Sequence, residues 1–205
     1  GDTGEAYISQ LTSAFIDAEG DYGYIDFHNQ SKLLRVVTEA AEAAGEFREK
    51  GNYEAAIDIC FTILEDGIEA INHSDDSMGY LGSIMDEGMQ GLNALADPDV
   101  CQLDEDSREA FMDRCWTCID EDTFDGWDWY AEMYDFLITL ANCEEEYKDI
   151  MECLDGDEYF SRDYYKRKQL QMKRELMLKW KGEDVAHELM MSNLQIQEFR
   201  EKAIE

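Results

Sequence analysis

The chain has 205 residues, of which 49 are acidic and 17 are Lys or Arg, so its formal net charge at pH 7 is -32. This charge argues against duplex DNA and anionic membranes as direct ligands, because proteins bind phosphates through clustered Lys and Arg. Apolar residues make up 44% of the chain, which excludes intrinsic disorder, and no apolar run reaches the roughly 18 residues of a membrane span.

A single proline and an excess of helix-forming residues predict an all-α fold. Ser31 is expected to cap the second helix, and Gly51 with Asn52 is expected to form a tight turn after it. From apolar residues at helical spacing we predict helices, in chain order, over about residues 5–17, 31–49, 53–71, 81–95, 105–119, 127–141, 144–154, 159–180 and 183–192, with a last one beginning near Gln195.

Short turns between successive helices predict antiparallel helix pairs stacked as a tetratricopeptide-like α-solenoid, with a compact helical bundle as the alternative. The turn at Gly51 matches the second half of a tetratricopeptide repeat, in which the small residue Ala56 lets two helices approach closely. We expect residues 1–205 to form a single helical-repeat domain. Both ends of the sequence are typical of a piece cut from a longer polypeptide.

The six cysteines are expected to be reduced thiols rather than three disulfides. Most of them occupy apolar positions of helical patterns, where a free Cys packs as a small hydrophobic residue. Reduced thiols in a chain of this length are typical of the cytoplasm, so a cytoplasmic location is predicted.

Two partial metal-binding patterns occur, and for each we favour a structural interpretation. Cys115 and Cys118 form a C-x-x-C, but a zinc site needs four ligands and the sequence has no second such pair. Asp125 and Glu132 fall at positions five and twelve of a calcium-loop pattern over residues 121–132 whose other positions match only in part. Buried core cysteines and a capped turn between helices are therefore expected, with no metal and no cofactor.

Aromatic and basic residues near two predicted helices are the candidates for an interaction surface. Trp129 falls outside the apolar stripe that joins Trp127 to Tyr130 and Tyr134, so an exposed or groove-lining position is expected for it. Eight of the 17 basic residues lie between positions 162 and 181, and we interpret them mainly as partners of acidic neighbours in the same protein. In this basic segment, the remaining candidates for contact with a partner are Tyr164, Tyr165 and Lys168.

The sequence offers little support for catalysis. His28, His73 and His187 are scattered, and none has a Ser, Cys or carboxylate partner at the spacing of a catalytic or metal site. Carboxylate pairs are too frequent in so acidic a chain to single out a general acid. The chain is therefore predicted not to be an enzyme, and an enzyme site among residues 120–134 remains a third hypothesis.

Several turn and packing motifs are spread over most of residues 22–205: Tyr24 to Phe27, Gly51 to Ala56, Asp75 to Gly82, Asp122 to Gly126, Asn193 with Leu194, and Glu198 to Arg200. They resemble the helical region that accompanies the SWIM zinc finger in a group of bacterial proteins. The resemblance implies a tetratricopeptide-like helical fold and no catalytic residues. The finger itself, two Cys one residue apart followed by a distant Cys-x-His, is absent here, so its metal and nucleic-acid binding is not implied.

Two functional hypotheses follow from these observations. In the first, the chain is a non-enzymatic scaffold for protein–protein interaction, and its acidic surface favours a basic protein or peptide as the partner. In the second, the chain is an acidic nucleic-acid mimic that occupies a basic protein. Rows of carboxylates at phosphate-like spacing would favour the mimic, whereas one less acidic groove would favour the scaffold.

Overall fold

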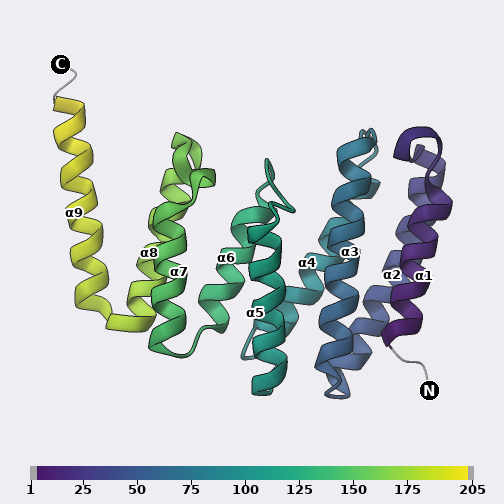
Figure 1. The fold of residues 1–205 in the computed structure, drawn as a ribbon, viewed down its shortest axis with the longest axis horizontal. Coiled ribbons are helices and arrows are strands. Elements are labelled where there is room, and N and C mark those ends of the chain that lie inside the picture. The colour runs from purple at the N-terminus through teal and green to yellow at the C-terminus, as the bar shows by residue number, and fades with distance from the viewer. Residues whose placement is uncertain (1–3, 203–205) are drawn as a thin grey trace. The chain divides into compact units, whose positions relative to one another are not determined.

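The computed structural model describes residues 4–202, with side chains described as far as residue 193. Within these residues the chain is helical and has no strand, which confirms the predicted all-α class (Figure 1). The elements are α1 (Gly4–Ala18), the short 3-10 helix η1 (Asp21–Gly23), α2 (Phe27–Glu49), α3 (Tyr53–His73), α4 (Tyr80–Ala96), α5 (Glu105–Asp120), α6 (Trp129–Leu140), α7 (Glu144–Gly156), η2 (Glu158–Ser161), α8 (Asp163–Lys181) and α9 (Glu183–Lys202).

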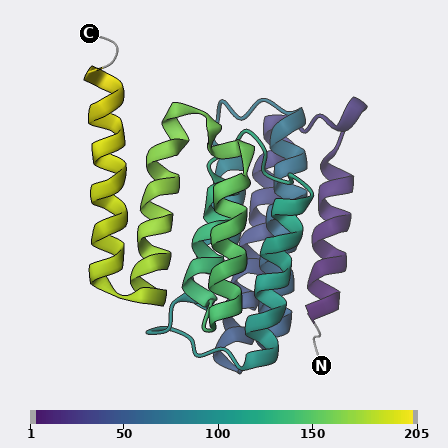
Figure 2. The same cartoon turned by 60° about the vertical axis from the view of Figure 1, so that its left-hand side comes forward.

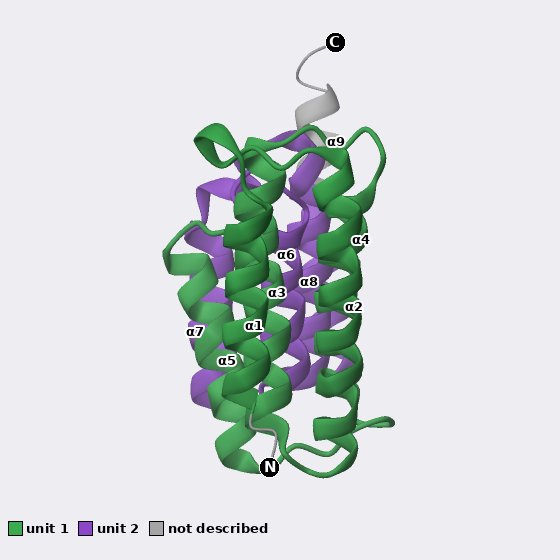
Figure 3. Ribbon diagram, turned by 90° about the vertical axis from the view of Figure 1, so that its right-hand side faces the viewer, with its two compact units in different colours: residues 1–124 green, residues 125–205 purple. Residues whose placement is uncertain are grey.

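The chain divides into two compact units, residues 1–124 and residues 125–205 (Figure 3). In the first unit, α1 packs on α2 and α3, α2 on α3 and α4, and α3 on α4 and α5. In the second unit, α6 packs on α7 and α8, α7 on α8, and α8 on α9. Packing between helices one or two places apart in the chain is typical of helical repeats. A single domain over residues 1–205 stays a prediction.

The predicted turn after α2 is present. Gly51 has a φ of +78°, a left-handed conformation that glycine adopts without a steric penalty. The Asn52 side chain then accepts a hydrogen bond from the Ala55 backbone N–H at 3.4 Å and so caps α3. Ala56, the small residue expected at the helix contact, is buried.

The start of α2 differs from its prediction. The helix begins at Phe27, and the Asp26 carboxylate caps it by accepting hydrogen bonds from the backbone N–H groups of His28 and Asn29, at 2.9 and 3.0 Å. Ser31 therefore lies inside the helix, and its prediction as the cap is wrong. A carboxylate placed before the first turn satisfies the free N–H groups better, because it also complements the positive end of the helix dipole.

The predicted break in the last helix is also wrong, because α9 runs without interruption through Gln195. The polar pair Ser192 and Asn193 stays helical. The Ser192 hydroxyl donates to the carbonyl of Glu188 at 2.9 Å, and the Asn193 amide donates to that of Leu189 at 2.8 Å. Polar side chains that bond to the preceding turn of their own helix do not end it.

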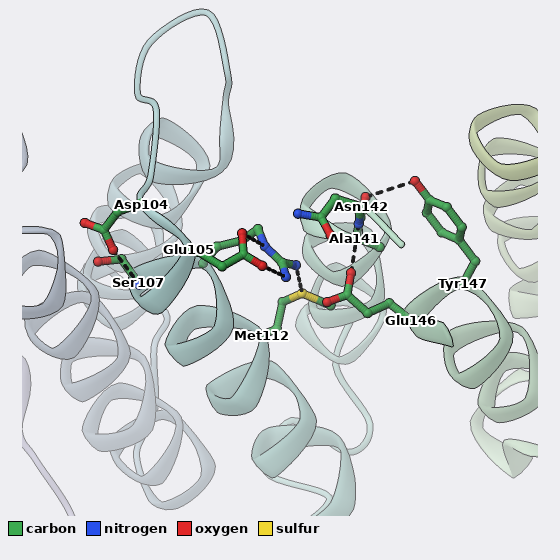
Figure 4. Close-up of polar contacts among 9 residues, drawn as sticks. Asp104, Glu105, Ser107, Met112, Ala141, Asn142, Glu146 and Tyr147 are labelled. Carbon is green, nitrogen blue, oxygen red and sulfur yellow. Dashed lines mark hydrogen bonds and ion pairs between the residues drawn. The ribbon is translucent and has the colours of Figure 1, made fainter. Parts of the chain in front are cut away.

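Side-chain carboxylates also begin α5 and α7. In the first unit, Asp104 accepts from the Ser107 backbone N–H at 2.8 Å (Figure 4), as expected for the helix predicted to start after Asp104. In the second unit, Glu146 reaches back from the first turn of α7 and accepts from the Asn142 N–H at 2.8 Å (Figure 4). Each contact satisfies a backbone donor that the helix cannot pair internally.

The buried Arg108 of α5 is held by the same helix. Its guanidinium donates two hydrogen bonds to the carboxylate of Glu105, at 2.6 and 3.1 Å, and a third to the Met112 sulfur at 2.8 Å. Glu105 and Met112 are labelled in Figure 4. Pairing of this kind is what permits a charged side chain to be buried.

The contact between α3 and α4 depends on glycine. A Cβ built on Gly88 would lie 2.8 Å from the Leu64 Cδ2 and 3.1 Å from the carbonyl oxygen of Cys60, which is backbone and cannot move aside. Gly45, on α2, has nothing within 4 Å of the same position. Substitutions at Gly88 therefore test close packing, whereas substitutions at Gly45 test helix propensity alone.

We expect Gly88→Ala and Gly45→Ala to change stability in opposite directions. Gly45→Ala should raise the free energy of unfolding by about 0.5–1 kcal/mol through helix propensity. Gly88→Ala should lower it by about 1–3 kcal/mol, because the added methyl group overpacks the contact. Denaturant unfolding of both variants measures the difference, and stabilisation by Gly88→Ala would contradict the close contact.

In the part of the chain that the structure describes, no helix combines the length and the apolar character needed to cross a bilayer.

Candidate functional site

The candidate site of the second unit rests on the half-buried carboxylate of Asp157, which joins three elements. The Tyr130 and Tyr134 hydroxyls of α6 both donate hydrogen bonds to Asp157 Oδ2, at 2.8 and 2.6 Å. The other carboxylate oxygen, Oδ1, accepts from the backbone N–H of Tyr159 at 2.9 Å and so caps η2. Burial and this bond to Asp157 raise the pKa of Tyr134, which keeps its hydroxyl a hydrogen-bond donor.

Stacked tyrosine rings connect this carboxylate to the surface. The Tyr159 ring stacks on Tyr130 at 4.4 Å between centroids and on Tyr165 of α8 at 4.3 Å. Its hydroxyl donates to the carbonyl of Trp127 at 2.9 Å. The exposed ring of Tyr164 then meets Tyr165 edge-on at 5.0 Å. The position of Tyr165 is thus fixed by packing, which pre-organises the surface that it helps to form.

This surface is a groove between α6 and α8, open to solvent, with a volume of about 310 Å³. One wall comes from the start of α6 and the other from the first turns of α8. The lining residues are Asp128, Ala131, Glu132, Tyr164, Tyr165, Arg167, Lys168 and Gln171. We call it the α6–α8 groove.

Charges of both signs line the α6–α8 groove. Lys168 forms an ion pair with Asp135 at 2.8 Å. Burial alone would lower its pKa, but the hydrogen bond and charge of Asp135, together with the charges of Glu132 and Glu175, raise it. The pKa of Glu132 is raised, first by burial and then by the charges of Asp135 and Asp128, with Lys168 opposing them. The carboxylate charge of Glu132 is therefore incompletely compensated, so a cation entering the groove would stabilise it.

Most of the basic residues of α8 pair within the protein, in line with the interpretation given to this segment. Lys179 donates to the carbonyls of Ile138 and Thr139, at 3.0 and 2.6 Å, and so satisfies the carboxyl end of α6. Within the described residues, the side chains of Arg162, which precedes α8, and of Arg167 and Arg174 form no ion pair or hydrogen bond. The ion pairs are Lys166 with Asp163 at 2.7 Å, Lys168 with Asp135, Lys173 with Asp155, and Lys181 with Glu144 at 4.0 Å.

The structure brings together three of the four residues proposed for an interaction surface. Tyr164, Tyr165 and Lys168 all line the α6–α8 groove. Trp129 does not line it: this half-buried residue begins α6, and its indole stacks on that of Trp127 at 5.0 Å. The predicted apolar stripe begins later than expected. Trp127 precedes α6 and is only half-buried, whereas Tyr130 and Tyr134 are buried.

The residues of the two metal-binding patterns have different surroundings. Cys115 and Cys118 are buried in α5, and burial raises the pKa of both thiols, that of Cys118 to about 12. Asp125 is exposed, and Glu132 lines the α6–α8 groove. Among the described residues, no three His, Cys, Asp or Glu side chains converge as a metal site would require.

All six cysteines carry free thiols. Cys60, Cys101, Cys115 and Cys118 are buried, and Cys143 and Cys153 are exposed. The buried thiols occupy core positions, as expected for free Cys.

Half of the groove lining, and Asp157 beneath it, were not predicted from the sequence. Asp128, Ala131, Arg167 and Gln171 complete the lining. Their positions carry a usable signal, because 128 with 131 and 132, and 164 with 167, 168 and 171, have the spacing of one helix face. Asp157 carries no such signal, because its partners lie 23 and 27 residues away.

Scans against family models, curated proteins and solved structures find no match to this chain. The last segment of the resemblance to SWIM-associated regions, Glu198 to Arg200, lies outside the residues whose side chains are described.

Proposed function

We propose that the chain is a non-enzymatic helical scaffold whose α6–α8 groove binds an extended segment of another protein. The observation that carries this proposal is the convergence of two tyrosine rings and four charged side chains on one open groove, with Tyr165 held in place by stacking on Tyr159. Interfaces are enriched in Tyr and Arg. The rigid ring of Tyr buries a large area at a low entropic cost.

The partner segment in this proposal carries basic side chains. A net charge of -32 steers positively charged proteins toward the molecule and raises their encounter rate at low salt. Inside the groove, Asp128 and Glu132 would face a Lys or Arg of the segment, and Tyr164 would offer its ring to the same cation. Arg167 is free to contact a carbonyl or carboxylate of the segment.

Two observations favour a scaffold over the other hypotheses. The lining of the α6–α8 groove contains no His, Cys or Ser, so the carboxylate of Glu132 has no such side-chain nucleophile beside it to activate. Arg162, Arg167 and Arg174 interrupt the acidic surface along α8, whereas a nucleic-acid mimic needs unbroken rows of negative charge. The resemblance to SWIM-associated regions supports extending the proposal: the scaffold would work beside such a zinc finger in a bacterial cytoplasm.

Site-specific photo-cross-linking tests the groove directly. A photoreactive amino acid replaces Gln171, an exposed lining residue, and in a matched protein it replaces Gln102, an exposed residue of the first unit. We expect a protein that cross-links at position 171 and not at position 102. In the protein with the photoreactive amino acid at position 171, the two substitutions Tyr164→Ala and Arg167→Glu together should lower the cross-linking yield at least about fivefold. A fivefold loss corresponds to about 1 kcal/mol of binding free energy.

The outcomes separate the hypotheses. Equal cross-linking at positions 171 and 102, or none at position 171, would contradict binding in the groove. A partner that duplex DNA displaces, and that still binds the Tyr164→Ala and Arg167→Glu variant, would establish the nucleic-acid mimic instead.

A further inference from the structure

A second surface, independent of the α6–α8 groove, lies in the first unit where α1 meets α2. Four large apolar side chains within twelve residues are exposed there: Ile16 (63%), Tyr22 (100%), Tyr24 (46%) and Phe27 (66%). We call these four residues the aromatic corner. Figure 2 shows η1, which contains Tyr22, projecting beyond the end of α1. Four large apolar side chains exposed within one short segment mark this segment as a candidate binding surface, because large apolar side chains are mostly buried in folded proteins.

The aromatic corner is fixed from beneath. Ile25 is fully buried, and its backbone N–H donates to the Ser74 hydroxyl at 2.9 Å. The buried amide of Gln30 donates to the carbonyls of Ile25 and Asp75, at 2.8 and 2.9 Å. These bonds tie the segment between α1 and α2 to the segment between α3 and α4. The exposed rings are therefore displayed on an anchored backbone.

The fold does not need the Tyr22 side chain. Its backbone is left-handed, with φ 63° and ψ 27°, a conformation that costs a non-glycine residue about 1 kcal/mol. Its ring is completely exposed, and within the described residues it makes no hydrogen bond or ring contact. A large aromatic residue at a position better suited to Gly or Asn points to a role outside the folded chain.

The charges around the aromatic corner define the partner. Asp17, Glu19 and Asp21 are exposed, and within the described residues their carboxylates form no hydrogen bond or ion pair. Residues 1–31 contain no Lys and no Arg, and Lys32, which lines a hollow together with Asp17, forms no ion pair among the described residues. Apolar rings among uncompensated carboxylates match a segment that has both apolar and cationic side chains, since Lys and Arg also stack on aromatic faces.

We propose that the aromatic corner docks a basic segment of another protein, one in which Lys or Arg alternates with apolar residues. The apolar side chains of the segment pack on Tyr22 and Phe27, and its cations face Asp17, Glu19 and Asp21. A second copy of this chain fits poorly, because two such corners would bring carboxylates against carboxylates.

The test uses two short fluorescent peptides of equal positive charge, one with Lys alternating with Leu and one with Lys alternating with Ser. Fluorescence anisotropy measures their binding to the full chain at about 0.1 M and about 1 M salt. At 1 M salt the Debye length is only about 3 Å, so non-specific attraction between charges further apart is screened out. We expect the Lys–Leu peptide to keep binding at high salt and the Lys–Ser peptide to lose it.

The variants assign the binding to the corner. Tyr22→Ser with Phe27→Ser should weaken the Lys–Leu peptide at high salt by at least about fivefold. Met78→Ser with Val100→Ser, which removes two other exposed apolar residues of the first unit (61% and 56%), should leave affinity unchanged. Tyr22→Gly should also weaken binding while raising the unfolding temperature by roughly 2–4 °C, so loss of fold cannot explain the effect.

Three results would overturn the proposal: unchanged affinity in the Tyr22→Ser and Phe27→Ser variant, an equal loss in the Met78→Ser and Val100→Ser variant, or no binding of the Lys–Leu peptide at high salt. A dimer in sedimentation that Phe27→Ser dissociates would assign the corner to a second copy instead. None of these results bears on cross-linking in the α6–α8 groove.

Discussion

Asp157→Ala should destabilise the second unit by about 2–4 kcal/mol. The substitution removes the acceptor of two tyrosine hydroxyls, those of Tyr130 and Tyr134, together with the cap of η2. These hydrogen bonds are only part-buried, so we expect about 1–3 kcal/mol for the two donors together and about 1 kcal/mol for the lost cap. Denaturant unfolding monitored by near-ultraviolet circular dichroism of the aromatic side chains measures the loss.

The same substitution should also weaken cross-linking at position 171, because Asp157 positions Tyr159 and Tyr159 stacks on Tyr165 of the groove. Asp157→Asn retains one carbonyl oxygen as an acceptor and should lose about half as much stability. Asp155→Ala, at an exposed residue paired with Lys173, is the matched control and should cause no measurable loss. If Asp155→Ala were as damaging as Asp157→Ala, the tyrosine contacts would not be the cause.

In the first unit, Arg114→Ala should lower the free energy of unfolding by about 2–3 kcal/mol. From α5, the Arg114 guanidinium bonds to two carboxylates of α3, Asp58 at 2.9 Å and Glu65 at 3.0 Å, and lies 4.8 Å from the ring centre of Phe61. Breaking a fully buried ion pair costs about 3–5 kcal/mol, and we expect less here because the Arg114 side chain is 29% exposed.

Salt and a conservative substitution separate charge from packing at this position. Without Arg114, Asp58 and Glu65 lie two turns apart on α3 with no cation between them, so part of the loss should disappear at about 1 M salt. Arg114→Lys, with one compact ammonium group, should restore one of the two ion pairs. Lys50→Ala breaks an exposed pair with Glu46 and should change nothing measurable. A loss in Arg114→Ala that is fully retained at high salt would assign its role to packing alone.

The helices were predictable from sequence because their signals are local. Apolar spacing and capping residues are read within one or two turns, which is why the starts of α3 and α5 follow directly from Asn52 and Asp104. The start of α2 was not predictable in this way, because two possible capping residues, Asp26 and Ser31, lie five positions apart and only the fold selects between them. Similarly, Ser192 does not end its helix because its hydroxyl donates to a carbonyl of the preceding turn, that of Glu188, and this choice of acceptor cannot be read from the sequence.

The α6–α8 groove was predictable only in part. Composition alone selected Tyr164, Tyr165 and Lys168, since aromatic and basic residues on an acidic chain are conspicuous. The opposite wall, Asp128 to Glu132, belongs to another helix, and which face of α6 meets α8 is decided by tertiary packing. The sequence likewise gave no reason to expect an exposed aromatic corner, because four apolar residues near a helix end are normally read as core.

The order of helix packing bears on how the protein is made. Within each unit the packed helices are one or two places apart in the chain, so the contacts span short stretches of sequence. Chains with such local contacts fold fast, because little loop entropy is lost before the first contact forms. During synthesis, a newly emerged helix finds its packing partner already outside the ribosome. Folding can therefore keep pace with translation, and stretches of exposed apolar surface that would attract chaperones remain short.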